Sequence, residues 1–372
     1  MIQPRSRRKI RYAVVGVGNI AQVAVLPAFA QARENSELAT FFHGDPAHRD
    51  PLLKKYRLKA AYAYGDFEKG LEEQQVDAVY IALPNHLHCE YAVRAARAGA
   101  HVLCEKPLSV TRAEARKIID AAHRYGVKLM TAYRLHFERA NLSAVELVRS
   151  GKLGDPRLFS SVFTMQVREG DIRTKRAMGG GTVYDIGVYC INAARSFFQA
   201  EPVEAFAFTA RRGGDRRFRE IDEMTGALLR FPGERLAAFT TSFGAADESC
   251  YEVVGTEGKL VVENGYDYTA PPRHALTVGG KTRVKTFARR DQFAPELLYF
   301  SRCILEDLEP EPSGMEGLID VEIVEALYRS AREGRPIPLR LPKKRLRPRG
   351  HLRIDRPRIR PPRLVAAPPP SR

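Results

Sequence analysis

Tryptophan is absent from this chain of 372 residues, and no run of 18 or more apolar residues occurs in it. A helix that crosses a membrane needs about 20 consecutive apolar residues, so the sequence predicts no membrane span. Cysteine is scarce, and its odd number and wide spacing exclude a disulfide framework or a zinc site of close cysteine pairs. We expect reduced, mostly buried thiols in a reducing compartment. The cysteines are Cys89, Cys104, Cys190, Cys250 and Cys303.

The histidines are equally dispersed. Among the nine, His86 and His88 form the only near pair. Two histidines in a loop, with no third ligand close by, are a weak metal signal, since a zinc site takes at least three protein ligands. We therefore predict no metal.

The N-terminus is basic and contains Ser6-Arg7-Arg8-Lys9. A twin-arginine export signal is one interpretation. An apolar strand and a glycine turn follow at once, however, with no separate hydrophobic region and no cleavage site. We favour a solvated basic leader before the first strand and expect a cytoplasmic protein.

The formal net charge of +16 suggests a nucleic-acid-binding protein until the charges are located. Residues 340–372 hold twelve Lys or Arg against one acid, Asp355, together with eight prolines. This composition predicts an extended, disordered, Pro/Arg-rich basic tail over residues 341–372. The tail is either a solvating extension or a contact for a polyanion, such as nucleic acid or an anionic membrane surface. The rest of the chain carries about +5, which is ordinary for an enzyme and gives no reason to expect nucleic-acid binding.

Strand-like and helix-like stretches alternate through residues 1–132. Apolar runs of strand length that alternate with helices predict a parallel, doubly wound sheet, and hence an α/β fold. The expected strands lie at 11–17, 38–42, 77–83, 101–104 and 128–132, and the expected helices at 21–32, 88–98 and 112–125.

After about residue 155 strands follow one another with only turns between them. Consecutive strands joined by short turns predict a large, mostly antiparallel sheet, and hence an α+β second domain over residues 133–340. We expect its strands at 158–168, 203–211, 225–231, 235–243, 251–254 and 259–262, and two closing helices near 295–307 and 315–333.

A glycine-rich turn follows the first strand and opens a helix. Its sequence, Gly16-Val17-Gly18-Asn19-Ile20-Ala21, matches the G-x-G-x-x-G/A fingerprint of Rossmann dinucleotide-binding domains. Gly16 allows the tight turn, Gly18 lets the backbone approach a pyrophosphate, and the helix N-terminus stabilises the anion. We predict that Gly16, Gly18, Asn19 and Ile20 bind a nicotinamide cofactor.

The end of the second strand indicates which cofactor. NAD-binding domains place a carboxylate there, but this chain has His43. His48 and Arg49 offer positive charge to a 2′-phosphate, whereas Asp45 keeps NAD open as an alternative. We prefer NADP, with His43 and Arg49 among its ligands.

Four further motifs identify a family. They are Leu83-Pro84-Asn85-His86-Leu87-His88, Cys104-Glu105-Lys106-Pro107, Ala132-Tyr133-Arg134, and the run from Gly179-Gly180-Gly181 through Asp185 to Tyr189. In this order and spacing the chain resembles the glucose-fructose oxidoreductase, inositol dehydrogenase and rhizopine-catabolism (Gfo/Idh/MocA) family from about residue 9 to 340. Tyr189 resembles the glucose-fructose oxidoreductase branch, because many other members have histidine there.

The resemblance implies that Lys106 and Tyr189 are catalytic. Oxidising a sugar hydroxyl removes a hydride and a proton, so a general base must stand beside the nicotinamide. A free tyrosine has a pKa near 10, and a neighbouring ammonium favours its phenolate. Asp185 lies four residues before Tyr189, on the same face of an expected helix, where it would bind sugar hydroxyls and hold the lysine charge. Asn192 would extend the same polar stripe.

Other positions carry over from the same motifs. Pro84 and Asn85 follow a strand, at the edge where open α/β sheets bind their ligands. The resemblance places these two residues, His88, Glu105 and Lys106 at the cofactor. It places Tyr133 and Arg134, together with Asp185 and Tyr189, at the substrate.

One departure concerns the nicotinamide pocket. Relatives commonly have a tryptophan-arginine pair about eight residues before the triple glycine, where this chain has Asp171-Ile172-Arg173. The nearby basic residues Arg173, Lys175 and Arg176 either bind a phosphorylated or acidic sugar or form a solvated loop.

The sequence thus predicts an NAD(P)-dependent oxidoreductase that transfers a hydride between a sugar or polyol carbon and nicotinamide C4. The alternative is a non-catalytic, nucleotide-binding regulator of sugar metabolism. By family habit we expect a homodimer or homotetramer built through the antiparallel sheet.

Overall fold

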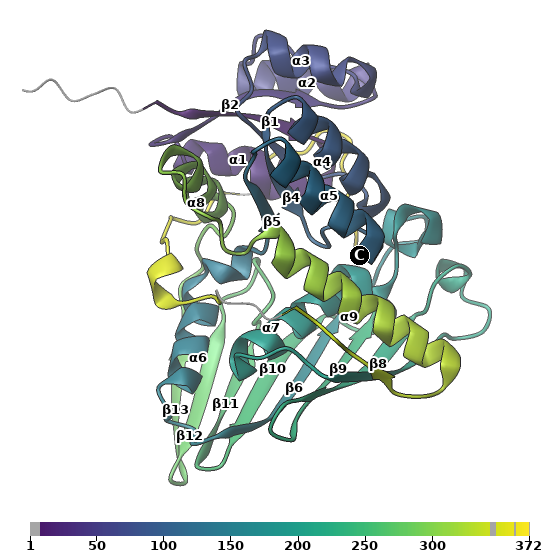
Figure 1. Cartoon of the computed structure of the whole chain (residues 1–372), viewed down its shortest axis with the longest axis vertical. Helices are drawn as coiled ribbons and strands as arrows, with labels where there is room; N and C mark the ends of the chain where they lie inside the picture. Colours follow the sequence, from purple (N-terminus) through teal and green to yellow (C-terminus); the bar gives the residue numbers. More distant parts are fainter. Residues whose placement is uncertain (1–7, 343–346, 361, 372) are drawn as a thin grey trace, which may run out of the picture.

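The computed structural model describes residues 8–342, 347–360 and 362–371 (Figure 1). The predicted basic leader before the first strand therefore lies mostly outside the described residues. The first domain is a five-stranded parallel sheet in the order β2-β1-β3-β4-β5. Its strands are β1 (Ile10–Val15), β2 (Ser36–Phe42), β3 (Ala78–Ile81), β4 (His101–Glu105) and β5 (Leu129–Ala132). The predicted Rossmann α/β fold is confirmed.

Helices cover both faces of this sheet. Along β1, Tyr12 and Val14 pack into one apolar cluster, whereas Ala13 and Val15 pack into the other, because side chains alternate between the two faces of a strand. α4 (His88–Arg97) and α5 (Arg112–Arg124) cover the second face. The remaining helical segments of this domain are η1 (Ala21–Val25), α1 (Leu26–Ala28), η2 (Phe29–Gln31), α2 (Pro46–Tyr56), η3 (Tyr64–Asp66), α3 (Phe67–Glu73) and η4 (Asn85–Leu87).

The first face is closed by a helix from far along the chain. α8 (Ala294–Leu305) packs its Leu297 and Phe300 into the cluster beneath β1, beside α1 (Figure 1). The hydroxyl of Ser301 lies 2.8 Å from that of Tyr12. The sequence assigned α8 to the second domain, whereas the structure packs it on the first. The core of the nucleotide domain therefore depends on residues near position 300.

The second domain is a nine-stranded sheet in the order β13-β12-β11-β10-β6-β9-β8-β7-β14. β6 and β9 pair in parallel and the other neighbours pair antiparallel, so the predicted mostly antiparallel sheet is confirmed. Its strands are β6 (Pro156–Thr164), β7 (Glu204–Ala210), β8 (Met224–Phe231), β9 (Arg235–Ser242), β10 (Glu248–Gly255), β11 (Gly258–Glu263), β12 (Arg273–Val278), β13 (Lys281–Thr286) and β14 (Ile337–Pro338).

Helices pack on one face of this sheet. α6 (Arg139–Arg149), α7 (Val188–Phe198) and α9 (Gly314–Glu333) lie between it and the nucleotide domain (Figure 1). α9 comes unusually close to the nucleotide domain, because a Cβ at Gly317 would stand 2.5 Å from the Cβ of Leu108. Short helical turns complete the domain: η5 (Arg134–His136), η6 (Ile172–Thr174), η7 (Arg176–Met178), η8 (Val183–Gly187) and η9 (Arg216–Phe218).

The described part of the basic tail lies against the body of the protein. It is extended apart from η10 (Gly350–Leu352), as the proline content predicts. The side chain of Leu352 is buried, and Ile354, Ile359 and Val365 pack against the core beneath β1. These contacts differ from the expected disorder. The overall composition of the tail, which is basic and rich in proline, does not show that four isolated apolar side chains can pack against the core. Residues 343–346, 361 and 372 of the tail lie outside the described residues.

Membrane spans and disulfides were not expected from the sequence. No helix among the described residues is long and apolar enough to cross a membrane. The five cysteines are free thiols.

Candidate active site

The glycine-rich turn lies between β1 and the helix that begins at its end. Gly16 has φ +90°, and a Cβ there would stand 2.7 Å from the carbonyl oxygen of Ala82 on the neighbouring strand, so the turn requires glycine. A Cβ at Gly18 would meet nothing within 4 Å. The first N–H groups of a helix have no partner within it, so those of Asn19 and Ile20 face the position where this fold binds a pyrophosphate. These residues fit a dinucleotide.

The end of β2 presents histidines. The rings of His43 and His48 lie 4.7 Å apart, and burial lowers the pKa of His43. Asp45 uses one carboxylate oxygen to cap α2 at the Ala47 N–H and the other to accept from His48, at 2.9 and 2.7 Å. Asp45 is therefore engaged within its own turn. Arg49 follows on the same helix and is half-buried.

Lys106 reaches across from the end of β4 to the second domain. Its Nζ donates to the carbonyl oxygen of Asp185 at 2.8 Å and lies 3.2 Å from the carboxylate Oδ1. It also lies 4.8 Å from the centre of the Tyr189 ring. Burial alone would lower the pKa of Lys106, but the negative charge of Asp185, with smaller contributions from Tyr189 and Glu105, raises it. The lysine is thus held as an ammonium.

Asp185 links two cations. Its Oδ2 accepts from Nε of Arg173 at 2.7 Å, while its Oδ1 faces Lys106. Burial would raise the pKa of this carboxyl, but Arg173 and Lys106 together bring it well below its ordinary value. Arg173 thus belongs to the site, whereas Lys175 pairs with Glu220 on the protein surface.

Tyr189 stands between two positive groups. The guanidinium of Arg134 lies 5.1 Å from the centre of the Tyr189 ring. The guanidinium is held in place because it donates to the carbonyl oxygen of Tyr266 at 2.5 Å and to the side-chain oxygen of Gln292. Both cations are drawn to the ring face. They would also stabilise negative charge that develops on the phenolic oxygen. The structure therefore brings Lys106, Asp185 and Tyr189 together, as the motifs predict.

A buried carboxyl pair lies beneath Lys106. Glu105 accepts from the Tyr80 hydroxyl at 2.8 Å, and burial raises its pKa. Glu296 of α8 is fully buried, and its pKa is raised well above the ordinary value by burial and then by Glu105. The charge of Glu105 therefore helps to raise the pKa of Lys106, while its side chain accepts from the Tyr80 hydroxyl.

The loop after β3 closes against the second domain. The side-chain amide of Asn85, next to Pro84, donates to the carbonyl oxygen of Gly179 at 2.9 Å. His88 is fully buried, with one ring nitrogen 2.8 Å from the carbonyl oxygen of Pro107 and the other 2.9 Å from that of Leu83. Burial lowers the pKa of His88 and favours the neutral ring, which has one N–H and donates it to one of these carbonyl oxygens. His88 therefore shapes the loops around Lys106, and its full burial does not fit the expected cofactor contact.

Tyr133 points away from this cluster. It is buried, and its hydroxyl donates to Asp320 of α9 at 2.5 Å. Asn192 lies in the same buried network and donates to Asp320 at 3.0 Å. The expected substrate contact of Tyr133 therefore does not fit its geometry, and the polar stripe predicted through Asn192 leads into the core.

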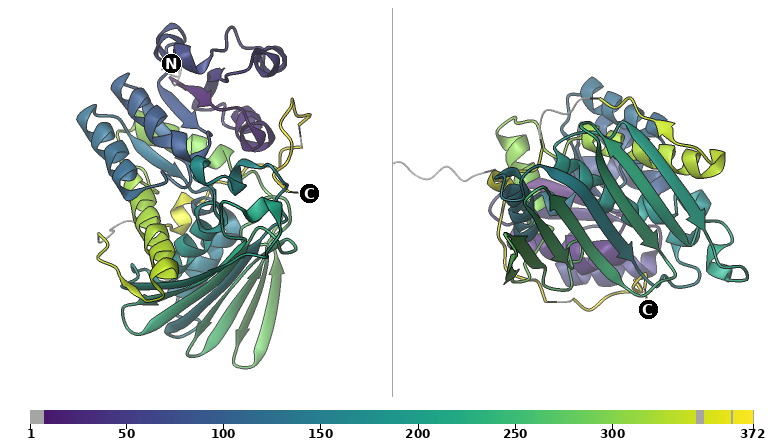
Figure 2. Two further views of the ribbon diagram at one scale, coloured as in Figure 1. Left: turned by 90° about the vertical axis from the view of Figure 1, so that its right-hand side faces the viewer. Right: turned by 90° about the horizontal axis from the view of Figure 1, so that it is seen from below.

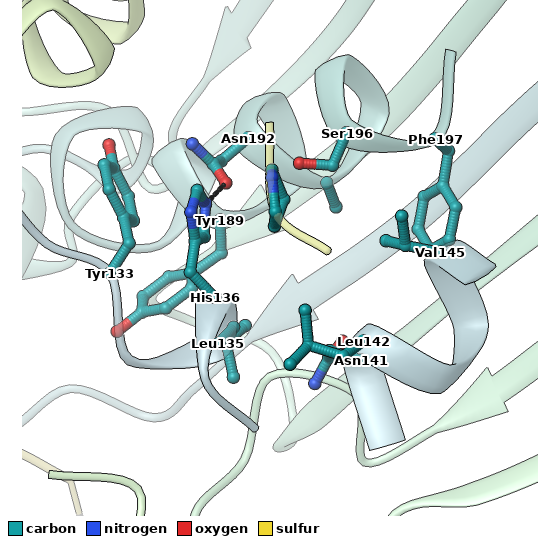
Figure 3. A pocket seen from close by; sticks show the side chains of 12 residues that line it. Tyr133, Leu135, His136, Asn141, Leu142, Val145, Tyr189, Asn192, Ser196 and Phe197 are labelled. Atoms are coloured by element: carbon teal, nitrogen blue, oxygen red, sulfur yellow. Dashed lines mark hydrogen bonds between the residues drawn. The ribbon is translucent and has the colours of Figure 1, made fainter. Parts of the chain in front are cut away.

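A small cavity lies in this region (Figure 3). It has a volume of about 30 Å³, about enough for one water molecule, and neither Lys106 nor Asp185 lines it. This cavity is too small for a sugar. The lining includes Tyr133, His136, Val145, Tyr189, Asn192 and Phe197.

Sequence reasoning missed several members of the site. Tyr268, from the loop after β11, lies 5.3 Å from the Arg134 guanidinium, and Gln292 fixes Arg134 from the turn before α8. Neither belongs to a motif, because both come from loops that fold back from the second domain. Acids at positions 316 and 320, four apart and so on one face of a helix, were a signal for the buried network.

Among the described residues no group of three or more His, Cys, Asp or Glu is placed to hold a metal ion.

Comparison with known proteins agrees with this geometry. A family model described as an oxidoreductase family with an NAD-binding Rossmann fold matches residues 10–133, and the GFO/IDH/MocA C-terminal domain model matches residues 142–261. The chain belongs to the Gfo/Idh/MocA oxidoreductase family. It is 31% identical to a D-xylose 1-dehydrogenase [NADP(+)] of Haloarcula marismortui over 337 residues, which is 88% of this chain and 93% of the relative.

Solved structures of this family are also similar. An aldose-aldose oxidoreductase from Caulobacter crescentus, complexed with glycerol, has a TM-score of 0.85 at 35% identity and covers 89% of this chain and 100% of its own. The 3-ketoreductase KijD10 from Actinomadura kijaniata, in complex with NADP and TDP-benzene, has a TM-score of 0.80 at 28% identity and covers 87% of this chain and 98% of its own. The chain is thus an oxidoreductase whose family members act on sugars with NADP.

Proposed function

We propose that this protein transfers a hydride between a sugar or polyol carbon and C4 of the nicotinamide of NADP(H). The observation that carries the proposal is the convergence of Lys106, Asp185 and Tyr189 across the two domains. The named activities of the xylose dehydrogenase and the aldose-aldose oxidoreductase support the same class of reaction.

The side chains divide the chemistry. When bound, NADP(H) would supply or accept the hydride. Tyr189 would move the proton of the reacting hydroxyl, and Lys106 and Arg134 would stabilise the charge on its oxygen. Asp185 keeps Lys106 protonated and in place. In the similar 3-ketoreductase KijD10, a variant at a lysine and a variant at a tyrosine have each been crystallised with NADP. The same two residue types are the ones we propose for the chemistry here.

The preference for NADP over NAD rests on Asp45. NAD recognition needs a carboxylate that is free to accept two ribose hydroxyls. Both oxygens of Asp45 are used by Ala47 and His48, which leaves His43 and Arg49 to face a 2′-phosphate. We propose that the glycine-rich turn with Asn19 and Ile20 holds the pyrophosphate.

We further propose a cytoplasmic homodimer or homotetramer. Five free thiols suit a reducing compartment. The face of the large sheet that carries no helix is apolar around Phe208, Leu228 and Leu236, which are 69%, 41% and 37% exposed (Figure 2, right). A second copy of this chain would cover that face. Contact of the basic tail with a polyanion stays a secondary possibility.

Absorbance at the reduced-nicotinamide band, followed with NADP and a panel of aldoses and polyols, tests the function. We expect turnover with at least one sugar, and we expect Lys106→Ala to abolish it while the protein still binds NADPH. Nucleotide binding without turnover on any sugar would instead favour the regulator.

A further inference from the structure

The last described stretch of the tail crosses the nucleotide domain, and we refer to residues 362–371 as the C-terminal strap. It runs along the outside of that domain and ends beside the second domain (Figure 2, left). The aldose-aldose oxidoreductase is covered along its whole length by only 89% of this chain, so part of this chain has no counterpart there.

The strap is fastened to the glycine-rich turn and its helix. Nδ2 of Asn19 donates to the carbonyl oxygen of Ala367 at 3.0 Å. Gln22, which is fully buried, pairs with Val365 in both directions: its Nε2 donates to the Val365 carbonyl oxygen at 2.9 Å, and its Oε1 accepts from the Val365 N–H at 2.8 Å. A buried amide paired with backbone in both directions is a specific fastening.

The strap also reaches the end of β2, where a 2′-phosphate is expected. Nε2 of His48 lies 3.2 Å from the carbonyl oxygen of Ala366, and Nζ of Lys55 donates to that of Arg363 at 2.7 Å. The strap therefore passes along the whole adenosine side of the proposed site.

Its far end is held by the other domain. The N–H of Arg168 donates to the carbonyl oxygen of Pro370 at 3.0 Å, and Nε of Arg168 donates to that of Ser371 at 2.9 Å. Arg168 precedes the loop that carries Arg173 to Asp185. The strap thus contacts both domains.

The contacts of the strap show whether it would lie over a bound nucleotide, as a cover, or occupy the nucleotide's own binding groups, as a plug. On the nucleotide domain it is held through side chains, those of Asn19, Gln22, His48 and Lys55. In the described stretches of the chain, no strap carbonyl accepts from the N–H of Gly18, Asn19 or Ile20, the donors that a pyrophosphate would use. A plug would take those donors, because they are the strongest anion-binding groups of the turn.

We propose that the C-terminal strap covers bound NADP(H) and slows its release, so that the nucleotide is retained between turnovers. This inference rests on the proposed function, since it requires the dinucleotide to lie at the glycine-rich turn. It gives the basic tail a role within its own chain.

The test compares NADPH release from four proteins: the full chain, a chain that ends at Arg360, Val365→Pro, and the control Arg360→Ala. Proline at 365 removes the N–H that Gln22 accepts, whereas Arg360 is exposed and lies before the strap. Each protein is loaded with NADPH and mixed with excess NADP⁺, and the loss of bound NADPH fluorescence gives the release rate. Thermal unfolding of each protein without nucleotide confirms that it is folded.

We expect release to be about tenfold faster, or more, from the shortened chain and from Val365→Pro, and unchanged in Arg360→Ala. Equal rates in all four proteins would overturn the strap's role and leave the proposed function intact. Tighter binding by the shortened chain would also overturn it, since the strap would then obstruct the site. If none of the four binds NADPH, the proposed function fails and the inference fails with it.

Discussion

Asp185 divides its two carboxylate oxygens between Lys106 and Arg173. Oδ1 faces Lys106 at 3.2 Å and Oδ2 accepts from Arg173 at 2.7 Å. The arginine comes from the loop where relatives have a tryptophan-arginine pair. Its guanidinium fixes the carboxylate and so fixes the lysine, which makes Arg173 a positioning residue.

Replacing Asp185 by asparagine should change the pH dependence of turnover. Asp185 raises the pKa of Lys106 against the effect of burial. Without that charge the pKa of Lys106 falls, so the ammonium is lost at lower pH and the alkaline limb of the kcat profile moves to lower pH. Asp171→Asn is the control, because Asp171 contacts Arg173 and makes no contact with Lys106. An alkaline limb that does not move in Asp185→Asn contradicts the assigned role.

The sequence predicts the residues of this site where both partners of a contact lie in family motifs, even when the two motifs are far apart in the chain. Lys106, Asp185 and Tyr189 lie in such motifs, and the structure brings them together. Tyr133 shows the limit of this reasoning: its motif places it at the end of β5, but the direction of its side chain depends on Asp320, which lies far away in sequence.

At the scale of secondary-structure elements, α7 and α9 are joined by a buried ion network. Arg195 of α7 has no exposed surface and donates to Glu316 at 2.8 Å and to Asp320 at 2.6 Å, both on α9. It also donates to Glu201 just beyond α7. Tyr189 lies in the first turn of α7, so this network fixes the helix that carries it.

Arg195→Met should therefore be strongly destabilising. It leaves three carboxylates near one another without their shared cation, which costs about 3–5 kcal/mol when a buried pair is broken on one side. Urea unfolding measures this cost. Arg329→Met on the exposed face of α9 is the matched control, where loss of the surface pair with Glu333 should cost under about 1 kcal/mol. Equal costs in the two variants would show that the network contributes little.

Apolar runs that alternate with helices gave β1 to β5, and successive strand-like stretches with turns between them gave β7 to β9. α2, α3, α6 and β12 were not expected. β13 was missed because all six of its residues are exposed, so it has no apolar period to detect. α8 was predicted as a helix, but the domain on which it packs was predicted wrongly. An apolar helix carries no signal in its sequence for which of two cores it enters.

At the scale of the whole molecule, the large sheet has one covered face and one bare face. Two cross-strand pairs on the bare face are apolar: Leu158 lies opposite Leu236, and Phe206 opposite Leu228. A contiguous apolar patch of this kind is typical of an interface between subunits. The order of the strands creates it, because the sequence spreads these residues over 79 positions.

Leu228→Lys should weaken the proposed assembly. A charge at the centre of a desolvated interface is not paired, so we expect the native mass to fall towards that of one chain. Native mass spectrometry reads this directly. Leu305→Lys is the control, since Leu305 is as exposed as Leu228, at 41%, but lies at the end of α8. A chain that is already monomeric in its unchanged form would refute the proposed interface.

The central claim is that Tyr189 moves the proton while a hydride passes to or from the nicotinamide, and single-turnover kinetics with a deuterated sugar test it most directly. NADP-loaded protein is mixed with a substrate that carries deuterium at the reacting carbon, and the reduction of the nicotinamide is followed. The assay compares the unchanged protein, Tyr189→Phe and the control Tyr184→Phe. Tyr184 is a suitable control because its hydroxyl donates to the carbonyl oxygen of Val110. We predict a primary isotope effect in the unchanged protein and in Tyr184→Phe, and reduction about 10²–10⁴-fold slower in Tyr189→Phe with NADP still bound. Equal rates in the two variants would contradict the account.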